Sequence, residues 1–264
     1  MSKVFGINFS ALDKAELIED LTTEPVMTGS GIAMLVTANV DHVVNLLRNA
    51  AFRAAYSNAK LATADSFPVA VYAKLRGADL PGRLAGSDLF AALMPAFVPG
   101  RHRPFFVVSR ESTGPHLRDY LVGRGFASED VGFVCPPFGF ERDSDYSQAL
   151  AGQIRAHGTT HLVMGVGSPK SELWLYKWRD ALGDCYGMGF GAGIDFFVGT
   201  EIRAPKWMQT LCLEWFWRMA REPKRIAPRV LRDAALFPVA VWRDATGRWW
   251  VDAPGDQSMP SQRS

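Results

Sequence analysis

Asp65 is the strongest candidate in the sequence for a catalytic acid or base. It follows a short apolar run at 59–64 and precedes a segment of helical character that starts at Phe67. A carboxylate between a buried strand and a helix is partly desolvated, which raises its pKa toward the range of a useful general base. An aspartate that caps a helix occurs in the same place, and the pattern alone favours that simpler role.

Other polar residues and glycines stand where further apolar runs end. They are Thr37, Asn39, Gly167, Ser168 and Asp195. In open parallel sheets, ligands bind beyond the carboxyl ends of the strands. These residues, together with Asp65, therefore predict a binding site along one edge of a sheet. Arg83 precedes another predicted helix start, at Ser87 or Asp88, and either faces an anion or forms a surface salt bridge.

The elements that must position these residues alternate regularly along the chain. Short apolar runs, each followed by a polar turn and a segment of helical periodicity, predict strands within 31–40, 59–66, 104–110, 131–140, 161–170 and 185–197. This alternation predicts an α/β fold, a Rossmann-like parallel sheet with helices on both faces. It stops after Gly199. We therefore predict a catalytic core at 1–198, a mostly helical basic and aromatic C-terminal appendage at 199–246 that docks on a membrane, and a flexible tail at 247–264.

The appendage carries the sequence "LEWFWRMAREPKRI" at 213–226, in which aromatic and basic residues are mixed. We predict a helix from about 205 to 222 with one apolar face, broken by Pro223 and Pro228, and a short strand-like piece at 236–244. Aromatic, apolar and basic residues together suit a segment in the interface of an anionic membrane. The alternative, which the sequence leaves open, is that the aromatic face packs on the core.

Several classes of site and location are disfavoured by the composition. Three widely spaced cysteines fit a reducing compartment, and neither a signal peptide nor an apolar run long enough to span a membrane is expected. The histidines show no zinc spacing, and we expect no metal. Asp143-x-Asp145 resembles a metal-binding pair, but a helix cap is favoured there. A net charge of +2 does not point to nucleic acid, and we expect no nucleic-acid partner.

The glycine-rich stretch "GMGFGAG" at 187–193 allows a second hypothesis. It departs from the dinucleotide fingerprint at Ala192, and no ribose-binding acid follows at the right distance. It fits equally well a phosphate or sugar against bare backbone and a tight turn against the sheet. A Rossmann-type nucleotide-dependent oxidoreductase and a non-catalytic scaffold on a membrane therefore remain as competing hypotheses.

Six segments together resemble one known family. They are "TANVDH", "LATADSFPVA", "RLAGSDLF", "VMGVGSPKSELW", "GFGAGIDFFVGTEIRAPKWMQ" and "LEWFWRMAREPKRI", and they occur in the family's order between residues 31 and about 243. The chain is similar in this way to the WecG/TagA/CpsF glycosyltransferases, and within them to the GumM-like exopolysaccharide glucosyltransferase branch.

The resemblance implies an inverting, metal-independent enzyme, with no cofactor. It would move a hexose from a UDP-sugar to a sugar-diphosphate-undecaprenol acceptor, as a peripheral protein on the cytoplasmic face of the bacterial inner membrane. It also implies self-association. Asp65 matches the family's proposed base, Thr37 and Asn39 match a polar pair beside the pocket, and Arg83 matches a nearby arginine. Arginines of the appendage are expected to bind the diphosphate: Arg218, Arg221, Arg225 and Arg229.

The sequence departs from the family pattern at three places. Ser66 follows the aspartate where glycine is common, Ser171 replaces a glutamine of a P-K-Q-E motif, and "VVSRESTG" replaces a more glycine-rich turn. The departures bear on the sugar more than on the reaction. They favour UDP-glucose and a β-1,4 linkage, with UDP-N-acetylmannosamine or its uronic acid as the alternative donor.

Overall fold

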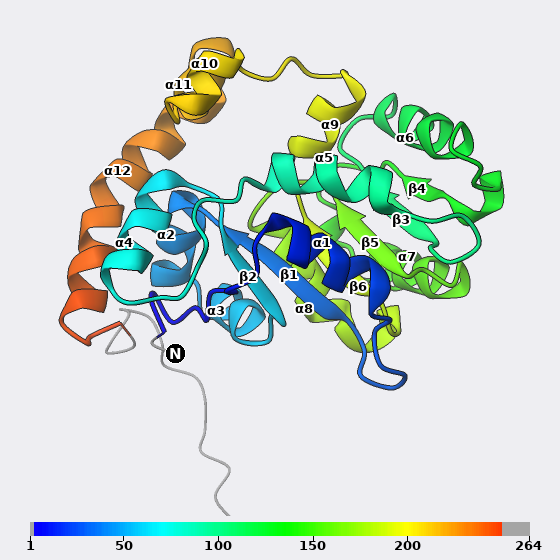
Figure 1. Ribbon diagram of the computed structural model, residues 1–264, viewed down its shortest axis with the longest axis horizontal. Coiled ribbons are helices and arrows are strands. Elements are labelled where there is room, and N and C mark those ends of the chain that lie inside the picture. The colour runs from blue at the N-terminus through cyan, green and yellow to red at the C-terminus, as the bar shows by residue number, and fades with distance from the viewer. Residues whose placement is uncertain (1–2, 250–264) are drawn as a thin grey trace, which may run out of the picture.

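Between residues 3 and 249, which the computed structural model describes, six strands form one sheet in the order β2-β1-β6-β5-β3-β4 (Figure 1). All neighbouring strands run parallel. The strands are β1 (Ala33–Ala38), β2 (Leu61–Ala64), β3 (Pro104–Val107), β4 (Gly132–Val134), β5 (His161–Met164) and β6 (Tyr186–Gly189). Each lies within a run that the sequence predicts as a strand.

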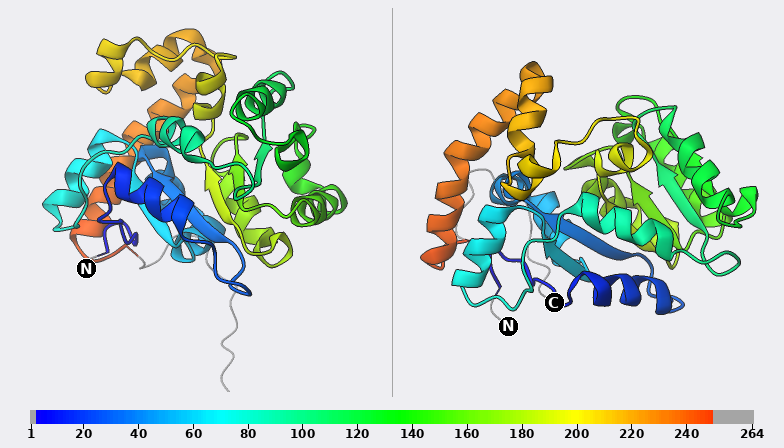
Figure 2. Two further views of the ribbon diagram at one scale, coloured as in Figure 1. Left: turned by 45° about the vertical axis from the view of Figure 1, so that its right-hand side comes forward. Right: turned by 45° about the horizontal axis from the view of Figure 1, so that its top comes forward.

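Helices cover both faces of the sheet, as predicted (Figures 1 and 2). One face packs against α1 (Lys14–Thr23), α5 (Gly86–Ala96), α6 (Thr113–Val122) and α9 (Gly193–Val198). The other packs against α2 (Val40–Arg48), α3 (Ala50–Ser57), α7 (Ser144–Ala156) and α8 (Lys170–Leu182), and the same hydrophobic cluster includes α4 (Phe67–Leu75). Two short 3₁₀ helices, η1 (Ser128–Asp130) and η2 (Phe140–Arg142), flank β4.

The C-terminal segment is helical, but its helices differ from the predicted ones. The expected helix at 205–222 is divided into α10 (Lys206–Thr210) and α11 (Glu214–Arg221), because the chain turns between them at Cys212, whose φ is 58°. The long helix α12 (Pro223–Ala245) follows. The helix α11 ends before Pro223, as predicted, and Pro223 stands in the first turn of α12, where no N–H is needed. Pro228 was also expected to break the helix, but α12 continues through it.

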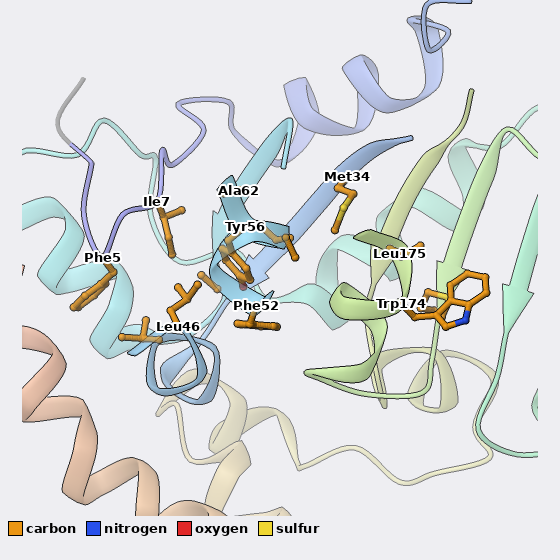
Figure 3. Packing of buried hydrophobic residues seen from close by; sticks show 14 of the residues in the cluster. Phe5, Ile7, Met34, Leu46, Phe52, Tyr56, Ala62, Trp174 and Leu175 are labelled. Atoms are coloured by element: carbon orange, nitrogen blue, oxygen red, sulfur yellow. The ribbon is translucent and has the colours of Figure 1, made fainter. Parts of the chain in front are cut away.

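The expected strand-like piece at 236–244 is wrong, because these residues belong to α12. Phe237, Ala240 and Val241 recur at helical spacing and pack on the main hydrophobic cluster of the core, some of which Figure 3 shows. The β-branched and aromatic composition suggested a strand, but packing of this one face stabilises a helix instead.

The last turns of α12 are also fixed to the core by hydrogen bonds. The buried Asp244 carboxylate accepts from the Phe5 N–H at 2.6 Å and from the Tyr72 hydroxyl at 2.9 Å. The boundaries 1–198, 199–246 and 247–264 stay predictions, and 250–264 lie outside the described residues. Because α12 covers part of the core, point substitutions test the appendage more cleanly than a truncation. None of the helices within 3–249 has both the length and the apolar character needed to cross a membrane.

Candidate active site

A cavity of about 640 Å³ opens beyond the carboxyl ends of the strands. Its lining combines residues that follow strands of the sheet with residues of α11 and α12. Of the predicted site residues, it brings together Thr37, Asn39, Asp65, Gly167, Ser168, Asp195, Arg218, Arg225 and Arg229. Their proximity follows from the parallel sheet, whose strand ends all point to the same edge.

Register places Asp65 beside Asn39. Ala38 of β1 pairs with Ala64 of β2, so the next residue of each strand leaves the sheet at the same level. The Asn39 amide donates to Asp65 Oδ2 at 3.4 Å, and the Gly86 N–H donates to Asp65 Oδ1 at 3.0 Å. The Asp65 carboxylate thus accepts from a backbone N–H at the start of α5. It does not cap α4, the helix that directly follows it in the sequence. The sequence predicted Ser87 or Asp88 as the cap of α5, but this is wrong, because the N-cap is Ala85.

The environment of Asp65 suits a general base. Burial raises the pKa of this carboxyl above its usual range, and the hydrogen bonds from Gly86 and Asn39 oppose only part of that shift. The two donors orient this partly buried carboxylate, and burial makes it more basic than an exposed aspartate.

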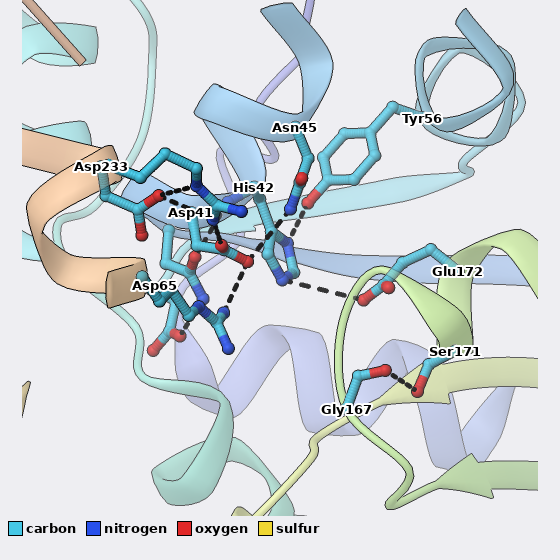
Figure 4. Close-up of polar contacts among 12 residues, drawn as sticks. Asp41, His42, Asn45, Tyr56, Asp65, Gly167, Ser171, Glu172 and Asp233 are labelled. Atoms are coloured by element: carbon cyan, nitrogen blue, oxygen red, sulfur yellow. Dashed lines mark hydrogen bonds and ion pairs between the residues drawn. The ribbon is translucent and has the colours of Figure 1, made fainter. Parts of the chain in front are cut away.

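Asn39 has a second role as the N-cap of α2. Its side-chain oxygen accepts from the His42 N–H at 3.1 Å. Asp41, two residues further on, is buried and accepts from Arg229 and Arg232 of α12 (Figure 4). The segment after β1 therefore reaches both the cavity and the appendage.

The strand ends on the other side of the sheet contribute glycines and a buried acid. Gly167 and Gly191 both line the cavity with positive φ, 82° and 49°. Asp195 is 3% exposed and accepts from the Thr113 hydroxyl at 2.5 Å. Gly193 packs tightly, since a Cβ there would lie 3.0 Å from Ser87 Cα. The glycine-rich stretch thus combines a tight turn with bare backbone at the cavity wall.

Arg218 brings a positive charge that lacks a close counter-charge. Its Nε is buried with no hydrogen-bond partner among residues 3–249. Burial, followed by repulsion from Arg229 and Arg225, lowers the pKa of Arg218. Arg225 is paired with Glu222, and Arg229 with Asp41. A desolvated guanidinium beside two like charges is well suited to bind an anion.

Arg83 and Arg221 do not line the cavity. Arg83 donates to Cys212 Sγ at 3.1 Å and pairs with Glu214 at 3.6 Å, so it connects the core to the turn between α10 and α11. Arg221 is exposed, with its guanidinium 5.7 Å from the centre of the Trp217 ring. Of the two roles expected for Arg83, binding an anion or forming a salt bridge, the structure shows the salt bridge.

Other cavity residues were not selected from the sequence as site residues. They include His42, Ser109, Arg110, Lys170 and Glu172, of which Ser109 and Arg110 follow β3 within three residues. The position after a strand is the signal that could have found these two. No signal in the sequence links His42 to Glu172, because they come from different helices and meet only in the fold.

The possible metal pair has a structural role. Asp143 caps α7 by accepting from the Tyr146 N–H at 2.9 Å. Within 3–249, no group of three or more His, Cys, Asp or Glu side chains is placed to hold a metal ion.

The contact of Asp41 with α12 predicts a stability effect. Replacing Asp41 with asparagine removes a buried charge that accepts from two arginines, and we expect it to lower the free energy of unfolding by about 2 kcal/mol. Urea unfolding followed by circular dichroism measures this. Asp180→Asn, at an exposed ion pair of α8, is the control and should change little. Equal stability of the two variants would mean that Asp41 does not anchor α12.

Comparison with known proteins identifies the family of this chain. A curated relative from Bacillus spizizenii (strain ATCC 23059 / NRRL B-14472 / W23) is 27% identical over 193 residues, which are 73% of each chain; it is named N-acetylglucosaminyldiphosphoundecaprenol N-acetyl-beta-D-mannosaminyltransferase. The profile of the glycosyl transferase WecG/TagA/CpsF family matches residues 2–250. The match spans nearly the whole sequence, so the chain belongs to the WecG/TagA/CpsF family of glycosyl transferases.

Proposed function

We propose that the enzyme transfers a sugar, with inversion and without a metal, from a UDP-sugar to a sugar that is linked to polyprenyl diphosphate. The observation that carries this proposal is the cavity that holds both Asp65 and Arg218, whose Nε has no hydrogen-bond partner in the described part of the chain. A base and an anion-binding group at one site are what such a transfer requires.

In the proposed reaction, Asp65 accepts the proton of the acceptor hydroxyl as that oxygen attacks the anomeric carbon. The bond from that carbon to the UDP oxygen breaks on the opposite face, and UDP leaves with the bonding electrons. Arg218 and its neighbours stabilise the charge that develops on the diphosphate. Asn39 orients Asp65 through their hydrogen bond.

The donor sugar is the finer part of the proposal. The name of the Bacillus relative favours UDP-N-acetylmannosamine, with N-acetylglucosaminyl-diphosphate-undecaprenol as acceptor. The three sequence departures favour UDP-glucose instead, with a glucosyl-diphosphate acceptor. Competition between the two labelled donors, with each acceptor in turn, decides between them. The donor that is transferred at the higher kcat/KM is the substrate, and transfer of neither donor would contradict the proposed function.

We also propose that the enzyme docks on the cytoplasmic face of the inner membrane as a peripheral protein. A polyprenyl acceptor stays in the bilayer, so the cavity must come to it. In Figures 1 and 2, α10 and α11 lie at one end of α12. They expose Trp207, Trp215 and Phe216, beside basic residues such as Lys206 and Arg221. This combination suits an anionic interface.

The double variant Trp215→Ser/Phe216→Ser tests the docking surface. Both side chains are 48% exposed, so their loss should spare the fold. We expect binding to vesicles of phosphatidylglycerol and phosphatidylethanolamine to weaken by about tenfold or more in a flotation assay, because apolar contact area is lost. Met27→Ser, at an exposed apolar residue before β1, is the control. Unchanged binding of the double variant would contradict docking through this surface.

A further inference from the structure

The carboxylate of Glu172 lies buried at the wall of the cavity with one oxygen unpaired. Glu172 belongs to the first turn of α8 and is 4% exposed. It lines the cavity, yet Oε2 has no hydrogen-bond partner anywhere in the described part of the chain. A buried polar atom without a partner is costly, so its presence in a substrate cavity indicates that a ligand completes it.

A chain of side chains behind Glu172 fixes its orientation (Figure 4). Glu172 Oε1 lies 3.8 Å from His42 Nε2, and His42 Nδ1 is 2.5 Å from the Tyr56 hydroxyl. Burial, followed by the charges of Glu172, Asp65 and Asp41, raises the pKa of Tyr56 well above its usual range, so the hydroxyl keeps its proton. When His42 is neutral, its Nδ1 accepts from the Tyr56 hydroxyl, and its Nε2 carries the hydrogen that faces Glu172.

The surroundings leave room for this carboxylate and for a ligand. Gly189 at the end of β6 lines the same cavity, and a Cβ there would lie 3.1 Å from Glu172 Oε1. A side chain at this position would therefore crowd the carboxylate.

The chemistry of Glu172 Oε2 selects the kind of ligand. A carboxylate oxygen is an acceptor only, so it needs a donor, and a diphosphate offers none. No metal-binding group of side chains is present within residues 3–249. Sugar hydroxyls are donors, and in the proposed function a sugar occupies the cavity beside Asp65. The arginines on α11 and α12 would hold the diphosphate, whereas Glu172, on α8, is left for the sugar.

We propose that Glu172 determines sugar specificity by accepting a hydrogen bond from a ring hydroxyl of the sugar bound in the cavity. The inference rests on the proposed function. The hydroxyl belongs to either the donor sugar or the acceptor sugar, and the two arms of the test distinguish them.

The test pairs Glu172→Gln with sugars that lack one hydroxyl. Wild type and variant are compared with monodeoxy forms of the donor in one arm and of the acceptor in the other. For one hydroxyl, wild type should lose about 10- to 100-fold in kcat/KM when the hydroxyl is removed, the typical effect of a hydrogen bond to a charged group. The variant keeps only an uncharged acceptor, so the same removal should cost it less than about tenfold. The affinity for UDP alone, measured by calorimetry, should change less than about twofold; a larger loss would mean that Glu172 binds a ribose hydroxyl or the uracil N–H of the nucleotide instead.

Two further variants keep the test decisive. Glu141→Gln is the matched control, because Glu141 Oε2 is also buried without a partner within 3–249 but does not line the cavity. It should respond to every deoxy sugar as wild type does. If Glu172→Gln does not fold, Glu172→Asp is used instead. Aspartate keeps the charge, but its side chain is one methylene shorter, so the carboxylate lies farther from the sugar. This variant should show the same loss of sensitivity.

The outcomes separate this inference from the function on which it rests. If wild type transfers sugar, and both Glu172 variants remain as sensitive as wild type to each deoxy sugar, Glu172 does not bind a hydroxyl and the inference is wrong. If wild type binds UDP but transfers no sugar, the proposed function is wrong, and the inference fails with it.

Discussion

Replacing Asp65 with asparagine is expected to lower kcat/KM for sugar transfer by about 10²- to 10⁴-fold, the usual contribution of general base catalysis. Asparagine keeps the size of the side chain and an acceptor for the Gly86 N–H, so the start of α5 should stay in place. What is lost is the group that accepts the proton of the acceptor hydroxyl. Initial rates of sugar transfer to the lipid acceptor measure the effect.

The control is Asp143→Asn, which changes an aspartate that caps α7 away from the cavity. Its kcat/KM should stay within about threefold of wild type. The pH profile is a second readout. Catalysis needs the ionised form of Asp65, and burial raises its pKa. Activity should therefore fall at a higher pH than for an ordinary aspartate as the solution is acidified. An Asp65→Asn variant with wild-type activity would show that another group is the base.

Replacing Arg218 with alanine is the second large expected effect, a loss of about 10²- to 10³-fold in kcat/KM. The diphosphate leaving group would lose a guanidinium at the cavity whose Nε has no partner within 3–249, whereas Arg225 and Arg229 are each paired with a carboxylate. Arg218→Lys should recover part of the loss, since lysine restores the charge but not the planar fork of donors. Steady-state transfer kinetics, together with the affinity for UDP, measure both variants.

Arg221→Ala is the matched control, because Arg221 lies on the same helix but outside the cavity. We expect its activity to stay close to that of wild type, although membrane binding could weaken modestly through the lost charge. If Arg221→Ala were as damaging as Arg218→Ala, the orientation of α11 that places Arg218 at the cavity would be wrong.

Local patterns predict the fold and part of the site. The strand ends at Asn39 and Asp65 can be recognised because an apolar run stops there, and the parallel sheet then brings them together. Such patterns cannot show which helix a side chain caps. Asp65 was expected to cap the helix after it, but it binds the start of α5, twenty-one residues away.

Contacts between distant segments account for what the sequence did not reveal. The pairing of Asp41 with Arg229 joins residues 188 positions apart, and no periodicity in either segment indicates it. The same holds for Glu172 and His42. In α12, apolar residues at 236–244 have the composition of a strand, and only the core that they cover stabilises them as a helix.

The measurement that tests the central claim most directly is transfer of labelled sugar into the lipid fraction in the presence of EDTA. Wild type and Asp65→Asn would be compared, with UDP-N-acetylmannosamine and UDP-glucose as donors and the two diphosphate-linked sugars as acceptors. We expect wild type to label the lipid from one donor at a rate that EDTA does not change, and Asp65→Asn to label it at least about a hundredfold more slowly. No lipid label from either donor, or equal rates for the two proteins, would contradict the account.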